Sequence, residues 1–160
     1  MTESPFSDFT AEELVAIGDN NVRSLAAFKH TDYGNAERLV QMYGDEMLWV
    51  PEWKCWLIWD GTRWRRDGDG GAERRAKATV RAMYAAAAGL DDESRNALVA
   101  HARKSEASAR LKATLEVSWT EDRMVVHPRD LDARPYLLNV QNGTLDLTTG
   151  RLREHDRDEL

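Results

Sequence analysis

Five of the chain's six tryptophans lie in one stretch, WVPEWKCWLIWDGTRWRRDG, which covers residues 49–68. Pro51 opposes a continuous helix through this stretch. The Asp60-Gly61 pair follows the apolar run CWLIW and precedes a second segment that contains Trp64, and such a pair between two runs is a turn signal of a β-hairpin. We therefore predict a hairpin with a two-residue turn at Asp60-Gly61.

The predicted turn determines which side chains face each other across the hairpin. The expected pairs are Trp59 with Thr62, Ile58 with Arg63, Leu57 with Trp64, and Trp56 with Arg65. One face, with Cys55, Leu57, Trp59 and Trp64, is typical of a core, while the other combines Trp56 and Ile58 with Arg63 and Arg65. Aromatic and arginine side chains together can stack on nucleotide bases, but arginine stems also cover indoles in ordinary folds. We favour the structural interpretation and keep the binding one open.

Composition limits the class of protein. A chain of 160 residues with 42% hydrophobic residues is long enough for one domain with its own core. Its formal net charge of −6 excludes a uniformly basic surface, so contact with nucleic acid requires a local patch. A single cysteine, Cys55, allows neither a disulfide framework nor a zinc ribbon within this chain. No basic leader and no apolar run of about 20 residues occurs, so we expect a cytoplasmic protein without a membrane partner.

Helical patterns occupy the first and middle parts of the chain. Thr10 is a candidate N-cap of a short helix that ends before GDNN at residues 18–21, and we expect residues 1–30 to form a flexible arm. A second short helix is predicted over residues 36–43. The longest helix is predicted over Ala72–Ala88, and Asp91 is expected to cap a helix that is followed by another over residues 107–119. Whether these last two join near Lys104-Ser105 is left open.

Basic residues gather on the predicted middle helices. Arg74, Lys77 and Arg81 share one helix face, and a denser run consists of Arg103, Lys104, Arg110 and Lys112. Cations on a helix face usually keep it solvated, but they can also follow a phosphate backbone. The candidate DNA-binding residues are therefore these seven side chains together with Trp56 and Arg65 of the hairpin.

The C-terminal part changes to an extended pattern from Met124 onward, with MVVHP, LLNV, TLDL and RLRE. Asn142-Gly143 is a turn signal between LLNV and TLDL, and Thr148 to Gly150 is a plausible turn between TLDL and RLRE. The predicted fold class is α+β, with central helices flanked by small β-hairpin or sheet elements.

No catalytic or metal site is predicted. The four histidines, His30, His101, His127 and His155, have no metal-ligand spacing, and we expect each on the surface or in a loop. The DGDGG segment at residues 67–71 lacks the remaining ligands of a calcium loop and is interpreted as a turn. Phosphate-cradling and nucleophile-elbow motifs do not occur. We therefore expect neither an enzyme active site nor a cofactor in this chain.

Three segments occur in a fixed order with the basic, alanine-rich helices between them: TDYGNAERLV, VPEWKCWLIWDGTRWRRD and LLNVQNGTLDLTTGRLREHD, at residues 31–40, 50–67 and 137–156. Together they resemble the domain that precedes the helicase motor in phage, plasmid and poxvirus primase-helicases. The resemblance covers residues 31–160. The positions that match are Asp32, Gly34, Asn35, Ala36, Arg38, Trp53, Trp56, Asp60, Gly61, Trp64, Asn139, Asn142, Gly143, Asp146, Thr149 and Gly150.

The resemblance implies a role in DNA replication. It implies a non-catalytic collar or linker that helps a helicase ring to assemble and to engage single-stranded or forked DNA, with self-association as a hexamer in the full-length protein. ATP and Mg²⁺ are expected only in the motor domain, which these residues do not include. We accordingly expect a piece of a longer protein, encoded by a phage, prophage or plasmid in a bacterial cell, with residues 31–160 as the collar-type domain.

The resemblance also separates structural residues from binding residues. It favours a structural role for Asp32, Asn35, Trp53, Trp59, Gly61, Trp64, Asn142, Gly143 and Gly150. Two other functions stay open. The chain is alternatively a stand-alone single-stranded DNA-binding module that uses the basic helical patch, and the least favoured alternative is an independent enzyme.

Overall fold

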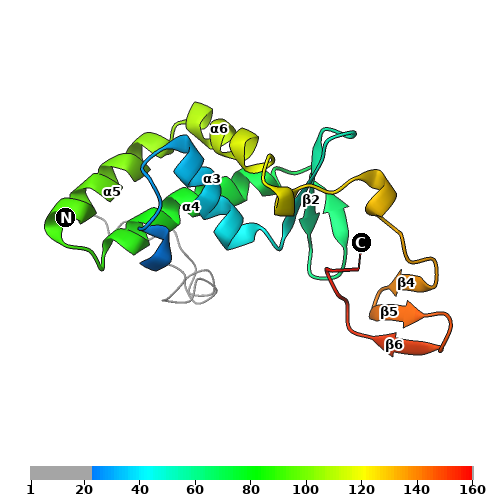
Figure 1. Ribbon diagram of the computed structural model, residues 1–160. Coiled ribbons are helices and arrows are strands. Elements are labelled where there is room, and N and C mark those ends of the chain that lie inside the picture. The colour runs from blue at the N-terminus through cyan, green and yellow to red at the C-terminus, as the bar shows by residue number, and fades with distance from the viewer. Residues whose placement is uncertain (1–22, 160) are drawn as a thin grey trace. The chain divides into compact units, whose positions relative to one another are not determined.

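The computed structural model describes residues 23–159. These residues form two compact units, which we name by their content. The helical unit consists of residues 23–42 and Glu73–Ser118, and the sheet unit consists of Tyr43–Ala72 and residues 119–159. Figure 1 shows the helices and the two groups of strands. The predicted α+β class is confirmed. The expected helix after Thr10 lies outside the described residues.

The four longer helices are α3 (Asp32–Tyr43), α4 (Gly71–Ala87), α5 (Asp92–Ser105) and α6 (Ser108–Ser118). The prediction for α4 is confirmed within one residue at each end. Helix α3 begins at Asp32, four residues before the predicted start, because Thr31 acts as its N-terminal cap: the Thr31 Oγ1 accepts a hydrogen bond of 3.0 Å from Gly34 N–H. Helices α5 and α6 are separate, which settles the question left open at Lys104-Ser105.

Two aspartates satisfy the free N–H groups at helix starts. The Asp91 Oδ1 accepts from the N–H groups of Glu93 and Ser94, as the predicted cap of α5. The carboxylate of Asp67 accepts from Gly71 N–H at 2.7 Å and from Ala72 N–H at 2.8 Å, so the DGDGG segment leads directly into α4. Asp67, the first aspartate of the segment that partly resembles a calcium loop, thus caps helix α4.

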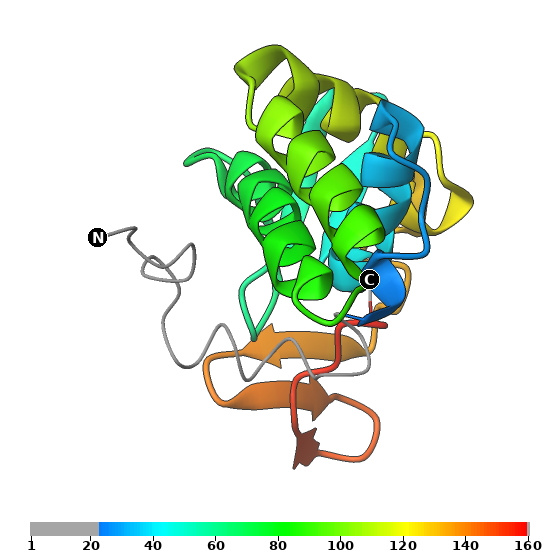
Figure 2. The ribbon, with the colours of Figure 1, turned by 90° about the vertical axis from the view of Figure 1, so that its left-hand side faces the viewer.

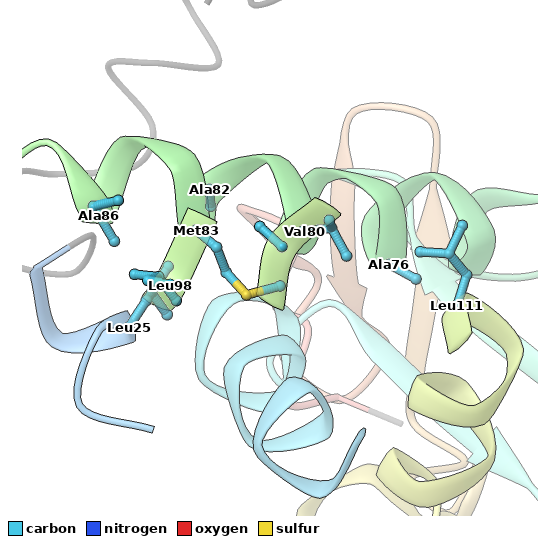
Figure 3. Close-up of a cluster of buried hydrophobic side chains, with 10 residues drawn as sticks. Leu25, Ala76, Val80, Ala82, Met83, Ala86, Leu98 and Leu111 are labelled. Atoms are coloured by element: carbon cyan, nitrogen blue, oxygen red, sulfur yellow. The ribbon is translucent and has the colours of Figure 1, made fainter. Parts of the chain in front are cut away.

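The core of the helical unit is built around the apolar face of α4. Figure 3 shows Ala76, Val80, Met83 and Ala86 along this helix, with Leu98 of α5 and Leu111 of α6 beside them. Leu25, which precedes α3, is fully buried in the same cluster. Small alanines on α4 allow the neighbouring helices to approach closely, and Figure 2 shows α4 and α5 side by side. Burial of this face stabilises the helical unit.

The tryptophan-rich stretch forms an antiparallel sheet of three strands, β1 (Met47–Val50), β2 (Cys55–Trp59) and β3 (Trp64–Arg66), in the order β1-β2-β3. The hairpin between β2 and β3 is confirmed, but the predicted register is wrong. Trp59 pairs with Trp64 and Ile58 with Arg65, so the loop is the four residues Asp60–Arg63. The sequence analysis also did not predict β1.

Asp60 causes this longer loop. Its Oδ1 accepts hydrogen bonds from the N–H groups of Thr62 and Arg63, both at 3.0 Å, and its own N–H donates to the Arg63 carbonyl at 3.1 Å. Gly61 has a φ of 96°, which glycine adopts without strain. A shift of two residues leaves each side chain on its predicted face, because side chains alternate along a strand with a period of two.

Strand β2 is buried on both faces. Leu57 packs in one cluster with Leu48, Val50 and Val126, while Trp56 on the other face is only 9% exposed. The Trp56 ring meets the Trp49 ring at 5.3 Å between centroids. A single parallel bridge joins Trp49 to Val125, so the predicted extended segment after Met124 contributes one bridge rather than a strand. The 3₁₀ turns η1 (Asp122–Met124) and η2 (Pro128–Asp130) lie on either side of it.

A second antiparallel sheet follows, with β4 (Leu137–Val140), β5 (Gly143–Asp146) and β6 (Arg151–Arg153) in sequence order. The predicted strands and both turn regions are confirmed, although Gly143 is the first residue of β5 rather than a loop residue. A Cβ atom on Gly143 would lie 2.2 Å from the Arg153 carbonyl oxygen. Glycine is therefore needed where β5 and β6 approach each other.

Candidate nucleic-acid interface

The predicted basic side chains of the helices are all exposed. Arg74, Lys77 and Arg81 follow one side of α4, because they are spaced three and four residues apart. Arg103 and Lys104 end α5, and Arg110 and Lys112 lie in the first turns of α6. The short connection through Glu106 thus brings four cations close together in the chain at the α5–α6 corner.

Two interactions position this corner. The Tyr84 hydroxyl of α4 donates a hydrogen bond of 2.7 Å to the Glu106 carboxylate, and burial together with this carboxylate raises the pKa of Tyr84 to about 12. Arg110 forms an ion pair of 2.8 Å with Asp32 at the start of α3. Asp32, one of the residues assigned a structural role, therefore neutralises one of the candidate DNA-binding cations.

The two candidates from the hairpin lie in the sheet unit and not with these helices. The predicted pairing of Trp56 with Arg65 is wrong, since Arg65 faces Ile58 in the four-residue-loop register. Trp56 is buried against Trp49, so its ring face is a packing surface. Arg65 is exposed and forms an ion pair of 3.3 Å with Asp69.

A buried polar network, which the sequence analysis missed, occupies the centre of the helical unit. Arg38 is fully buried, and its guanidinium donates to the carbonyl oxygens of Leu25, Phe28 and Lys29 at 2.9, 2.7 and 2.9 Å. Because these carbonyls belong to the segment before α3, Arg38 fastens that segment to the helix. Burial lowers the pKa of Arg38 to about 10.

Asn35 links this arginine to α5. Its Oδ1 accepts from His101 Nε2 at 2.9 Å, and its Nδ2 donates to Ser105 Oγ at 3.0 Å. His101 is 7% exposed in α5, so the expectation that each histidine is on the surface or in a loop is wrong for His101. Burial and the charge of Arg38 lower the pKa of His101 to about 4, which keeps the ring neutral at physiological pH.

Gly34 lets the segment before α3 approach this helix closely, because glycine has no Cβ atom. A Cβ atom at this position would lie 2.0 Å from the carbonyl oxygen of Lys29. The matched residues Gly34, Asn35 and Arg38 thus share one task, which is to hold residues 25–29 against α3 and α5. The side chains of Asn35 and Arg38 form their hydrogen bonds inside the protein, while the structural role of Asn35 stays a prediction.

The sheet unit contains a cavity of about 440 Å³. Three tryptophans, Trp53, Trp59 and Trp64, line it with the guanidinium groups of Arg63 and Arg66. Leu57 and Leu131 add apolar surface, and Asp132, Asn139 and Glu159 add polar groups. The sequence analysis assigned Trp59 and Trp64 to the core face, and both are half-buried at this cavity. The density of tryptophan and arginine in the sequence could have indicated this cavity. The sequence analysis instead assigned that signal to Trp56 and Arg65, which do not line it.

The remaining predicted structural residues lie at turns. Gly61 and Gly150 have positive φ values of 96° and 68° in their hairpin loops. In the second loop Asp146 Oδ1 accepts from the N–H groups of Thr148 and Thr149, as Asp60 does in the first. A hydrogen bond from the Thr148 hydroxyl, together with those from the two N–H groups, lowers the pKa of Asp146 to about 2. Asn142 is an exposed residue in the tight turn between β4 and β5.

A comparison with family models gives a match to D5 N terminal like over residues 36–160. The chain belongs to this family. The D5 N terminal like domain is the N-terminal domain of D5-like primase-helicases, so the suspected family is confirmed. The matched range includes the entire sheet unit and, of the described helical unit, everything from residue 36 onward. No curated protein and no solved structure matched the chain.

Two further findings concern residues 23–159. No group of three histidine, cysteine, aspartate or glutamate side chains in this range is placed to hold a metal ion. No helix in the same range is long and apolar enough to cross a membrane. The site features of this D5 N terminal like domain are therefore the exposed cations, the buried polar network and the tryptophan-lined cavity.

Proposed function

We propose that this D5 N terminal like domain is a non-catalytic collar or linker of a DNA primase-helicase, which supports ring assembly and engages DNA during replication. The observation that carries the proposal is the family match over residues 36–160. We assign ATP hydrolysis and its Mg²⁺ to a motor domain outside these residues. The parent replicon would belong to a phage, prophage or plasmid in a bacterial cell.

The exposed cations of the helical unit support DNA engagement. Lys77 and Arg81 on α4, and Lys104 and Lys112 at the α5–α6 corner, present positive charge to solvent although the chain as a whole carries −6. Such clusters attract the phosphate backbone without reading sequence, and they release counterions when they bind. The proposed contact is therefore sensitive to salt and independent of sequence.

Anisotropy of a labelled single-stranded oligonucleotide, titrated with the chain at low and at physiological salt, tests this contact. The charge-reversal variant combines Lys77→Glu, Arg103→Glu, Lys104→Glu and Lys112→Glu. Arg110 is left intact because its ion pair with Asp32 holds α6 to α3. We expect the variant to lose at least tenfold in affinity, and the wild-type affinity to fall with added salt.

A matched control reverses the same number of exposed charges in the sheet unit, at Lys54, Arg123, Arg129 and Arg151. If the control weakens binding as much as the helical variant does, the helical cations are not the contact. If neither wild type nor variant binds at either salt, DNA engagement by this domain is refuted, and the collar would be a protein-protein scaffold. Binding by the chain alone that is as tight as binding by the full-length helicase would favour the alternative of a stand-alone single-stranded DNA-binding module.

The second sheet supports the assembly part of the proposal. Leu138, Leu145 and Leu152 lie opposite one another across β4, β5 and β6, and therefore share one face. Leu138 and Leu152 are about half exposed, at 49% and 48%. Tyr136 and Leu147 extend this apolar surface beyond the strands. An exposed apolar surface of this kind marks an interaction site, and we propose a second copy of the domain as its partner.

Sedimentation velocity of the full-length helicase tests the assembly contact. The double variant Leu138→Glu with Leu152→Glu is expected to shift the ring toward monomers, because it places a charge on each exposed edge of the face. Val99→Glu, an exposed apolar residue of α5, is the control and is expected to leave the assembly unchanged. A parent protein that assembles normally with the double variant would contradict this contact.

A further inference from the structure

The cavity of the sheet unit lies between the β2–β3 hairpin and Asn139 of β4. Asn139 Nδ2 donates a hydrogen bond of 2.7 Å to the Thr62 carbonyl of the hairpin loop, which joins the two sheets at this point. The volume of about 440 Å³ is in the lower part of the range of small-molecule sites. It is therefore large enough for one flat ring system with its sugar and too small for a folded partner.

The lining of the cavity is aromatic and cationic. The Arg66 guanidinium lies 4.2 Å from the centre of the Trp53 ring, and the rings of Trp59 and Trp64 are 5.6 Å apart. Trp53 is 39% exposed, so a planar ligand can reach it. Tryptophan rings and arginine planes are the two surfaces on which proteins stack unpaired bases.

The polar groups are consistent with this ligand class. Trp64 Nε1 already donates to the Arg157 carbonyl at 2.8 Å, so Trp64 offers its ring rather than its N–H. Asn139 uses its Nδ2 on Thr62, which leaves its Oδ1 as an acceptor at the edge of the cavity. The Glu159 carboxylate is paired with Arg134 and Arg153, so its charge is compensated in the site.

Charge at the rim separates this cavity from a purely apolar pocket. The side chain of Arg63 is 69% exposed and lines the cavity from the hairpin loop. Arg66 of β3, whose guanidinium lies over the Trp53 ring, also lines the cavity. Two guanidinium groups next to an aromatic floor provide one surface for a base and another for its phosphate. Arg63 already has a counter-charge in Asp60, 3.6 Å away, so Arg66 is the cation that an apolar peptide would leave without one.

We propose that this cavity binds one unpaired nucleotide of single-stranded DNA, with its base on the indole of Trp53 and its phosphate at Arg63 and Arg66. This inference rests on the proposed function for the source of the ligand, which is the DNA that the helicase engages. The cavity residues are different from the basic residues of the helices. The cavity would stack on a base, whereas the helices would contact the DNA phosphates. Base–aromatic stacking tolerates any sequence, as a replication protein requires.

Two oligonucleotides of equal length test the proposal with the complete 160-residue chain. One is an oligothymidylate, and the other carries abasic sites in place of the bases but keeps every phosphate. We expect the wild type to bind the oligothymidylate at least fivefold more tightly. Trp53→Ala is expected to remove this preference, Trp53→Phe to keep part of it, and Arg66→Gln to weaken both ligands.

Trp119→Ala is the matched control. Trp119 belongs to the same unit and is 36% exposed, but it packs against Trp49 and does not line the cavity. The control is expected to keep the full preference for the oligothymidylate. Equal binding of both oligonucleotides by the wild type, or a preference that survives Trp53→Ala, would overturn the nucleotide site while leaving backbone engagement intact.

A titration with thymidine monophosphate separates this inference from the proposed function. The titration is followed by ligand-observed NMR. It uses the charge-reversed helical variant, which lacks the contact with the DNA phosphates but keeps the cavity. Contacts between the thymine ring and the chain that disappear in Trp53→Ala would support the site even if long DNA no longer binds. Absence of these contacts in both the wild type and the helical variant would refute it.

Discussion

The helical unit and the sheet unit use the residues that carry the sequence resemblance in opposite ways. In the helical unit, Asn35 and Arg38 are fully buried and hydrogen-bonded to other parts of the same unit. In the sheet unit, Trp53 is exposed and Trp64 is half-buried, and both line a cavity that is open to a ligand. Asn35 and Arg38 thus form their hydrogen bonds inside the first unit, while Trp53 and Trp64 lie at a cavity of the second.

This difference reverses the usual expectation that charged residues bind and aromatic residues pack. Arg38 carries a charge, but three backbone carbonyls and Asn35 occupy its donors. Trp53 is apolar, but a three-stranded sheet is too small to cover every ring on its face. The chemical type of a residue therefore does not show whether it is available to a ligand, while its partners do.

The largest expected effect comes from breaking the polar network of the helical unit. Arg38→Met would leave the carbonyls of Leu25, Phe28 and Lys29 without their donor, and we expect a loss of about 3 kcal/mol or more in the free energy of unfolding. Urea denaturation followed by circular dichroism measures it. Arg81→Met, at an exposed site on α4, is the control and should change the free energy by less than about 0.5 kcal/mol.

A steric change where residues 25–29 contact α3 is expected to cause the second largest loss in the free energy of unfolding. Gly34→Ala places a methyl group against the Lys29 carbonyl, and we expect a loss of about 2 kcal/mol. Gly89→Ala is the matched control, because a Cβ atom there meets no neighbouring atom. Thermal unfolding of both variants compares the two glycines. Equal melting temperatures would show that residues 25–29 do not lie against α3 as described.

The neutral state of His101 gives a pH-dependent test. Its pKa is about 4 in the folded protein and near 6.5 when unfolded, so the unfolded state binds the proton first as pH falls. Stability should therefore decrease between pH 6.5 and pH 4. His101→Gln, which can still donate to Asn35, should lose about 1 kcal/mol less over this interval, once solvent screening is allowed for. If the free energy of unfolding of the wild type and of His101→Gln changed in parallel with pH, His101 would not be a buried neutral residue.

The smallest effect on stability is expected at the cavity. Trp53→Ala removes a partly exposed ring and its contact with Arg66, so we expect a loss of about 1 kcal/mol or less. Trp56→Ala, on the buried side of the sheet, should cost about 3 kcal/mol or more. Urea titrations followed by tryptophan fluorescence distinguish the two. Similar losses would mean that Trp53 is a core residue, and the contrast between the two units would then be lost.

Much of the fold followed from local patterns. The apolar face of α4, the Asp91 cap and the strands of the C-terminal sheet were predicted from periodicity and turn residues. The first turn of α3 and the strand β1 were missed. Thr31 caps α3 through a hydrogen bond from a backbone N–H, and Met47–Val50 has no alternating pattern. The family was also predicted from three short segments, and the match over residues 36–160 confirms it.

The sequence by itself determined where the helices, the hairpins and the exposed cations occur, because these depend on neighbours within a few residues. Tertiary structure alone decided which tryptophans are covered and which polar groups are satisfied. Asn35 meets His101 across 66 positions, and Asn139 meets Thr62 across 77. Contacts over such separations are decided by packing between elements, and no local pattern carries that information.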